Sequence, residues 1–215
     1  MKTKLIFNII LLSISATRLL DAQNIKLPEP NITGGMPLMQ ALQERQSNRD
    51  FLPDELGLQQ LSDICWATWG INRQESGRRT APSSRNRQEM TLFVVLPEAT
   101  YIYDAKAHQL DLHQAGDLRP YCGSQDFVAQ APLNLIYVAD MEKLGLSNPD
   151  EIDGDRLMTP WANSGFMAQN AYLYCASEGL GTVVRAMIDR DTLHKKLGLS
   201  PMQQIILGQT VGKIK

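Results

Sequence analysis

Apolar and polar positions along the chain predict a mixture of helices and strands. In the first half, apolar side chains recur every three or four residues at 36–46 and at 58–69, which predicts two helices. Short β-rich runs follow at 91–96, 101–105 and 109–113, separated by turn residues. Runs of this kind are typical of an antiparallel meander.

The second half predicts one strand inside a sheet and one long helix. Residues 133–139 are almost all apolar, as expected for a strand that is buried on both faces. Residues 158–177 place apolar side chains on more than one face of a helix, so we expect burial on several sides, partly by a second subunit. The remaining patterns predict a strand at 182–185, a helix at 189–197 and a strand at 203–211. Because helices and strands follow one another irregularly, we predict an α+β fold.

The first 22 residues differ from the rest of the chain. Two lysines precede an apolar run at 5–14, and small and polar residues follow it. This order is typical of a secretory signal peptide, and the run is shorter than the ~20 residues that span a membrane. We therefore predict a signal peptide at 1–22, export to the periplasm, and no stable membrane anchor. Cleavage after Ala22 and cleavage after Ser15 are both compatible with the sequence.

Polar stretches divide the rest of the chain. Residues 23–36 contain two prolines and two glycines, which predicts an extended N-terminal arm before a domain at 37–215. Inside the domain, the polar stretches 70–90 and 140–157 predict loops. The second stretch is acidic, but it lacks one oxygen ligand of the EF-hand spacing, so we predict a solvated loop there.

Composition and charge exclude several classes of protein. The apolar fraction of 43% and the charged fraction of 20% suit a globular domain. With 21 basic and 23 acidic residues the net charge is −2, so no overall field attracts nucleic acid. Neither the three histidines nor Cys65, Cys122 and Cys175 have the spacing of metal ligands, and we predict no metal site. Cys65 and Cys175 lie in apolar helical patterns, which predicts buried, inert thiols.

The sequence carries no motif for catalysis by its own side chains. It has no nucleophile elbow, no phosphate-binding loop and no complete dinucleotide fingerprint. We therefore predict no catalytic acid, base or nucleophile and expect a bound cofactor to carry the reaction. Two polar clusters, at 45–49 and 78–89, are candidates for binding it. In the first cluster two arginines flank a serine, a combination that suits a phosphate group.

Four stretches, in this order, resemble the nitroreductase-like flavoproteins, which bind flavin mononucleotide (FMN). Residues 45–49 are similar to the family's Arg-x-Ser-x-Arg segment, and residues 82–86 are similar to its Pro-Ser-Ser-x-Asn loop. Residues 127–139 resemble its turn and central strand, and residues 165–185 resemble its long helix with the strand that follows. Together they extend over nearly the whole chain after the leader, so the ordered set is more specific than any single stretch.

The resemblance implies an interlocked homodimer with a central, mainly antiparallel sheet flanked by helices and one FMN at each subunit interface. The residues implied for the phosphate and ribityl chain are Arg45, Gln46, Ser47 and Arg49, with Lys213 near the C-terminus and Lys215 as its alternative. Those implied to reach the flavin from the neighbouring subunit are Pro82, Ser83, Ser84 and Asn86. The strand against the isoalloxazine ring would contribute Val184 and Arg185. Arg85 is an unusual charge for the loop at 82–86, and we assign it to an anionic group of the substrate.

The function implied by the resemblance is that of an FMN-dependent oxidoreductase. It would transfer a hydride from a donor, NAD(P)H or another, through the flavin to a small acceptor such as a nitroaromatic or a quinone. Export leaves the donor open, because nicotinamide cofactors are cytosolic. Two alternatives therefore stand beside it: an exported flavin- or ligand-binding protein without redox turnover, and an enzyme that acts on the flavin or on a peptide ring.

Overall fold

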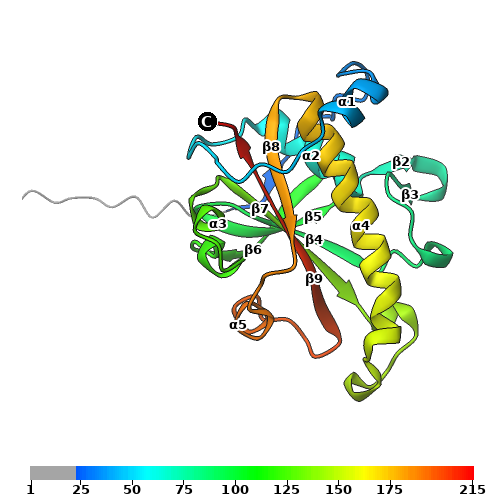
Figure 1. The fold of residues 1–215 in the computed structure, drawn as a ribbon. Coiled ribbons are helices and arrows are strands. Elements are labelled where there is room, and N and C mark those ends of the chain that lie inside the picture. The colour runs from blue at the N-terminus through cyan, green and yellow to red at the C-terminus, as the bar shows by residue number, and fades with distance from the viewer. Residues whose placement is uncertain (1–22) are drawn as a thin grey trace, which may run out of the picture.

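The structure, a computed structural model, describes residues 23–215, and the predicted signal peptide lies outside the described residues. Figure 1 shows helices on both sides of a twisted sheet. In the described part of the chain, seven strands form one antiparallel sheet in the order β1-β6-β5-β4-β7-β9-β8. They are β1 (Ile25–Lys26), β4 (Met90–Val95), β5 (Ala99–Asp104), β6 (Gln109–Ala115), β7 (Leu133–Asp140), β8 (Leu180–Arg185) and β9 (Gln203–Lys213). The α+β prediction is confirmed.

Side chains alternate between the two faces of the sheet and build two cores. Leu92 and Val94 of β4 pack with residues of α2 (Leu58–Trp69) and α4 (Gly154–Ser177), whereas Phe93 and Val95 pack on the other face with residues of α5 (Arg190–Lys196). The short helix α3 (Asp126–Gln130) joins the second core. The period of two along β4 thus produces three layers, helix, sheet and helix.

The strand predicted at 133–139 is confirmed as an interior strand. β7 lies between β4 and β9, and every residue from Leu133 to Ala139 is buried. The predicted meander is confirmed as well, because β4, β5 and β6 pair in succession. The helix predicted at 58–69 has the same bounds as α2, whose Ile64 and Cys65 are completely buried.

Helix α4 begins four residues before the predicted start, because Asp153 caps it by accepting a hydrogen bond from the Arg156 backbone N–H at 2.9 Å. Its buried residues form one stripe: Pro160, Asn163, Ser164, Met167, Ala168, Ala171, Tyr172 and Cys175. Met158, Trp161 and Phe166 are exposed on the same helix. Within a single chain, one face of α4 is therefore buried. Burial of its exposed side chains by a second subunit stays a prediction.

The predicted loop at 70–90 contains a small hairpin, which corrects the sequence interpretation. β2 (Ile71–Arg73) pairs with β3 (Arg78–Arg79), and a 3₁₀ turn, η2 (Ser84–Asn86), follows. The strands are short and mostly polar, so no apolar alternation marks them. In the other predicted loop, at 140–157, the described elements are two 3₁₀ turns and the start of α4.

The N-terminal arm is held against the sheet by a partly buried hydrogen-bond network. Ser62 Oγ donates to the Pro28 carbonyl at 2.6 Å, and His108 Nε2 lies 3.0 Å from the same oxygen. The other ring nitrogen of His108 lies 2.9 Å from the Tyr103 hydroxyl. Burial lowers the pKa of His108, which favours the neutral imidazole in this network. None of the helices between residues 23 and 215 is long and apolar enough to cross a membrane.

Candidate functional site

The residues that follow α1 (Leu38–Glu44) run along the outer edge of the sheet. This edge segment, residues 45–52, contacts β8 where the Asn48 N–H donates to the Thr182 carbonyl at 2.9 Å. It then meets the end of β9, because the Leu52 N–H donates to the Lys213 carbonyl at 2.9 Å. Gly181 permits the close approach, since a Cβ there would lie 3.1 Å from the Cβ of Asn48. The predicted phosphate cluster is thus fixed to the backbone of β8 and β9.

Tyr172 of α4 brings three of the predicted residues together. Its hydroxyl accepts a hydrogen bond from the Val184 N–H at 3.0 Å and lies 2.7 Å from Ser47 Oγ. The Arg45 guanidinium lies 5.2 Å from the centre of the Tyr172 ring, within cation–π range. Sequence reasoning counted Tyr172 among the apolar residues of the helix and missed this role.

Gln46 and Arg49 are exposed beside this centre. Gln46 lines a small hollow of about 100 Å³ together with Tyr172 and Thr182. Arg49 lines a second hollow, of about 350 Å³, together with Phe127. Amide and arginine side chains that face open hollows can donate hydrogen bonds to an anionic group.

The two C-terminal lysines lie at the same edge of the sheet. Lys213 Nζ is 3.6 Å from a carboxylate oxygen of Asp54, and Lys215 Nζ is 2.8 Å from one of Asp50. Both pairs are largely exposed, so each is weak. Lys213 and Lys215 can therefore turn toward an anion at the edge segment at little cost.

Val184 and Arg185 lie on opposite faces of β8. Val184 packs against the core under α4, whereas the buried Arg185 side chain donates to Asn134, Thr210 and the Cys122 carbonyl on the other face. Burial lowers the pKa of Arg185 to about 10. Its guanidinium is therefore bound on the face opposite to Tyr172. Contact of Arg185 with the flavin stays a prediction, and on the Tyr172 side only its backbone could make that contact.

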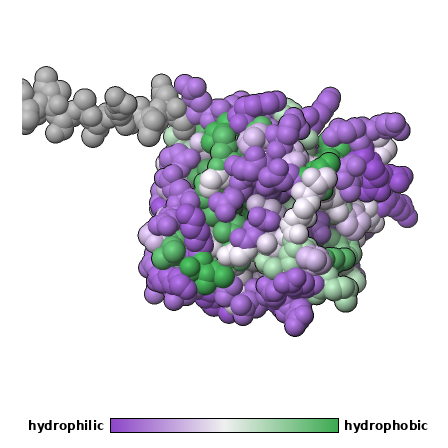
Figure 2. Space-filling model, turned by 90° about the horizontal axis from the view of Figure 1, so that it is seen from above, coloured by the Kyte–Doolittle hydropathy of each residue, from purple (hydrophilic) through white to green (hydrophobic). Residues whose placement is uncertain are grey.

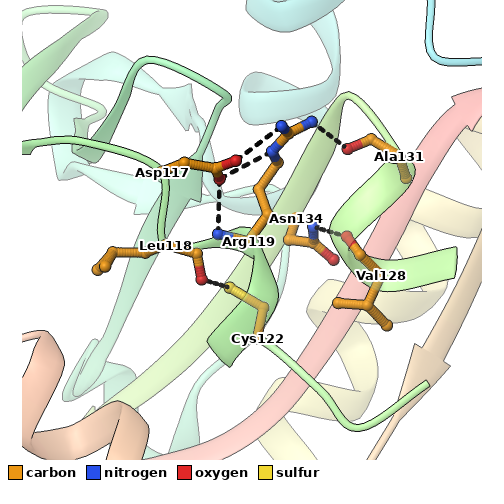
Figure 3. Close-up of polar contacts among 7 residues, drawn as sticks. All are labelled: Asp117, Leu118, Arg119, Cys122, Val128, Ala131 and Asn134. Atoms are coloured by element: carbon orange, nitrogen blue, oxygen red, sulfur yellow. Dashed lines mark hydrogen bonds and ion pairs between the residues drawn. The ribbon is translucent and has the colours of Figure 1, made fainter. Parts of the chain in front are cut away.

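Two partners of Arg185, Cys122 and Asn134, lie beside a turn that is itself fixed by hydrogen bonds. Figure 3 shows Arg119 bound to both carboxylate oxygens of Asp117 and to the Ala131 carbonyl. It also shows the Asn134 amide donating to the Val128 carbonyl at 2.9 Å. These contacts orient the start of β7, and with it the oxygen of Asn134 that receives Arg185.

The second predicted cluster lies on the other side of α4. In Figure 1 the β2–β3 hairpin and the loop after it are separated from β8 and the edge segment by α4. The loop at 82–86 is tied back by Gln88, whose N–H donates to Ser83 Oγ at 3.1 Å. Arg85, Asn86 and Gln88 all have positive φ angles, 52°, 55° and 49°. One chain therefore does not bring Pro82, Ser83, Ser84, Arg85 and Asn86 to the edge segment.

Strained left-handed residues concentrate in loops with a binding role. The residue that follows this loop, Glu89, is completely buried and accepts a hydrogen bond from the Asn163 amide of α4 at 2.5 Å. Its second carboxylate oxygen has no partner within the described residues.

Residues 23–215 contain no cluster of three or more His, Cys, Asp or Glu side chains that could hold a metal ion.

Fold and site together define an α+β protein with two separate groups of ligand-type donors around one long helix. The sequence profile of the Nitroreductase family matches residues 42–213. A candidate nitroreductase of Methanocaldococcus jannaschii is 31% identical over 183 residues, which cover 80% of this chain and 88% of that protein. The chain belongs to the nitroreductase family.

Solved structures agree with this assignment. A candidate nitroreductase of Ralstonia eutropha JMP134 is 43% identical, with a TM-score of 0.83 over 90% of each chain. The NADPH:FMN oxidoreductase of Vibrio harveyi, solved with NAD⁺, is 22% identical, with a TM-score of 0.60 over 83% of this chain and 66% of that one. At that identity the second similarity supports the fold alone.

Proposed function

We propose that this member of the nitroreductase family is an FMN-dependent oxidoreductase. The observation that carries the proposal is the Tyr172 centre, which holds Arg45 and Ser47 against the backbone of Val184. These are residues that the family resemblance implies for the flavin. They come from two separate segments, the edge segment and β8, and Tyr172 of α4 joins them, which supports one binding site.

The donors at this edge fit the phosphate end of FMN. Two guanidinium groups, from Arg45 and Arg49, and the Ser47 hydroxyl offer bidentate and single hydrogen bonds to phosphate oxygens. Lys213 lies at the same edge and is paired only weakly, with Asp54. When bound, FMN would supply the hydride chemistry, accepting from the donor and passing to the acceptor. The chain's own residues would bind, orient and shield it.

We further propose a homodimer with the flavin at the interface. Six large apolar side chains of α1 and α4 are exposed: Leu38, Met39, Leu42, Met158, Trp161 and Phe166. A second subunit packed along these helices would cover them. A second subunit, related by two-fold symmetry and packed there, would bring its own loop at 82–86 across α4 to the edge segment of the first subunit. The separation of the two clusters within one chain is what such an arrangement requires.

The donor and acceptor that we propose are NAD(P)H or another reductant, and a small nitroaromatic or quinone. The first test is the visible spectrum of the purified protein, before and after incubation with FMN. A colourless protein that takes up no FMN would refute the proposal. If it is yellow, anaerobic NADH or NADPH should bleach the flavin band. Bound flavin that no donor and acceptor pair can turn over would favour a binding protein without redox activity.

The phosphate assignment has its own test. The double variant Arg45→Ala with Arg49→Ala should bind FMN on the order of 100-fold more weakly, because each arginine contributes a charge-assisted hydrogen bond. Arg156→Ala is a matched control, since Arg156 is an exposed arginine at the far end of α4. Equal FMN affinity in all three proteins would refute the assignment.

Export is proposed from the leader at 1–22. The elements of the described domain begin at Ile25, so cleavage after Ala22 would leave each of them intact. N-terminal sequencing of the protein from the periplasmic fraction should give Gln23 as the first residue. Recovery in the cytosolic fraction with an uncleaved leader would contradict export.

A further inference from the structure

A basic hollow lies between the β2–β3 hairpin and the loop at 82–86. It encloses about 390 Å³, and its lining residues are Arg73, Arg78, Arg79, Ala81, Pro82, Ser83, Arg85 and Asn86. Four of these are arginines and none is acidic. Figure 2 shows hydrophilic residues over the right-hand edge of the molecule, the side on which Figure 1 places the hairpin. We name this hollow the arginine pocket.

Asp104 acts on Arg79 only through space, and no carboxylate of the described residues forms an ion pair with an arginine of the pocket. Among residues 23–215, the ion pairs are those of Arg119, Lys213 and Lys215, and none of them involves a pocket arginine. Guanidinium groups that share a hollow without a carboxylate repel one another, and an anion placed among them removes this repulsion. The chain as a whole has a net charge of −2, so the pocket concentrates positive charge against the overall balance.

Two of the pocket arginines are held in place before any ligand arrives. Arg79 stacks on Trp69 at 4.6 Å and donates to the Trp69 carbonyl and to Gln88 Oε1, both at 2.8 Å. Arg73 donates to the Arg79 carbonyl at 3.0 Å. Burial lowers the pKa of Arg79, so its charge gains more from a nearby anion than a fully hydrated guanidinium would.

The other two arginines have their donors free. Within the described residues, the side chains of Arg78 and Arg85 make no hydrogen bond or ion pair, and both are exposed. Arg85 is fixed at a φ of 52°, and Gln88 ties its loop to the hairpin by donating to the Gly77 carbonyl at 3.0 Å. A fixed backbone that presents free guanidinium forks suits bidentate recognition of anionic oxygens.

We propose that the arginine pocket binds the anionic groups of the small molecule that exchanges electrons at the flavin, and that this molecule carries two or more negative charges. The redox part rests on the proposed function, because only the dimer places the loop at 82–86 beside a flavin. The anion-binding part does not rest on it. The volume of the pocket admits a phosphate-, sulfonate- or carboxylate-bearing group, and the remainder of the molecule would extend toward the flavin.

The first experiment measures anion binding directly, by titrating inorganic pyrophosphate into the purified protein in a calorimeter. The test variant combines Arg78→Ala with Arg85→Asn, since asparagine tolerates a positive φ and carries no charge. It should bind pyrophosphate roughly 100-fold more weakly than wild type, with unchanged FMN content. Arg156→Ala should match wild type, and binding should weaken as salt rises.

Undiminished pyrophosphate affinity in the double variant would overturn the proposal. A parallel fall in FMN content would overturn it as well, because the pocket would then belong to the flavin phosphate site. A colourless protein that still binds pyrophosphate through these arginines would refute the proposed function and support the anion site. The experiment can therefore refute the proposed function and the anion site independently of each other.

The second experiment identifies whether the arginine pocket binds the electron donor or the electron acceptor. We compare KM for NADPH with KM for NADH, and KM for anthraquinone-2,6-disulfonate with KM for the neutral menadione. In the double variant, KM for the more charged member of one pair should rise at least ~10-fold more than KM for the other member. A selective rise for NADPH identifies the donor, and a selective rise for the disulfonate identifies the acceptor. Equal changes within both pairs would overturn the redox part of the proposal.

Discussion

Two tyrosines on α4 give opposite predictions for the same chemical change. The Tyr172 hydroxyl accepts from the Val184 N–H and contacts Ser47 Oγ, whereas the Tyr174 hydroxyl is buried and has no partner within the described residues. Substitution of either tyrosine by phenylalanine removes one oxygen and keeps the ring. Tyr172→Phe should therefore destabilise the protein, and Tyr174→Phe should not.

The magnitude follows from the groups that each change leaves behind. Without the Tyr172 oxygen, the outward N–H of Val184 on an edge strand loses its acceptor, which costs about 2 kcal/mol. Ser47 is exposed and regains a hydrogen bond to water, so it adds little. Removal of the Tyr174 oxygen relieves a buried, unpaired hydroxyl and should change the free energy of unfolding by ~0 to 1 kcal/mol in the stabilising direction.

Urea unfolding followed by circular dichroism measures both effects. With a slope of roughly 2 kcal/mol/M for a domain of this size, the midpoint of Tyr172→Phe should fall by about 1 M, and that of Tyr174→Phe should stay or rise. Tyr172→Phe should also retain FMN less well, because Ser47 loses its anchor. Equal midpoints for the two variants would refute the hydrogen-bond reasoning.

Three further predictions concern stability. Because burial lowers the folded-state pKa of His108, its contribution is complete above the unfolded value of about 6.5 and is lost as pH falls below it. The urea midpoint of wild type should therefore drop more than that of His108→Gln between pH 8 and pH 5, and parallel curves would contradict this. Gly181→Ala should destabilise the protein by about 1–3 kcal/mol through overpacking. Gly165→Ala should be neutral or stabilising in the same assay, because a Cβ at Gly165 would meet no atom within 4 Å. Similar losses of stability in both variants would argue against close packing at Gly181. Asn163→Leu should cost about 3 kcal/mol because it leaves the carboxylate of Glu89 buried without a donor, and a midpoint equal to wild type would show that Glu89 has another partner.

Burial patterns made most of the fold predictable from the sequence. Residues 58–69 repeat apolar side chains at helical spacing, and the bounds of α2 agree with the prediction. Residues 133–139 form an apolar run of strand length, and β7 is interior to the sheet. In both segments the hydrophobic effect acts on positions that the sequence displays directly. The β2–β3 hairpin has no such pattern, because its stability comes from backbone pairing and from arginine contacts.

The site was predictable in composition but not in orientation. Arg45, Ser47 and Val184 were found by resemblance, and the structure brings them together. Tyr172 was hidden, because a tyrosine in an apolar stripe does not reveal where its hydroxyl points. The alternation of side chains along β8 sends Arg185 to the opposite face from Val184. Which face receives a ligand depends on the layers, and these follow only from the assembled sheet.

The three cysteines have a consequence for how the protein would withstand the flavin chemistry that we propose for it. All three are buried and free, and burial raises the pKa of Cys122 to about 12 and those of Cys65 and Cys175 further. At neutral pH they are thiols and not thiolates, which makes them poor targets for peroxide and for disulfide exchange. Reduced flavins release peroxide when they react with oxygen, so an interior without reactive thiolates would protect the protein from this by-product if it binds FMN as we propose. It also frees folding from the redox state of the compartment, since no disulfide has to form.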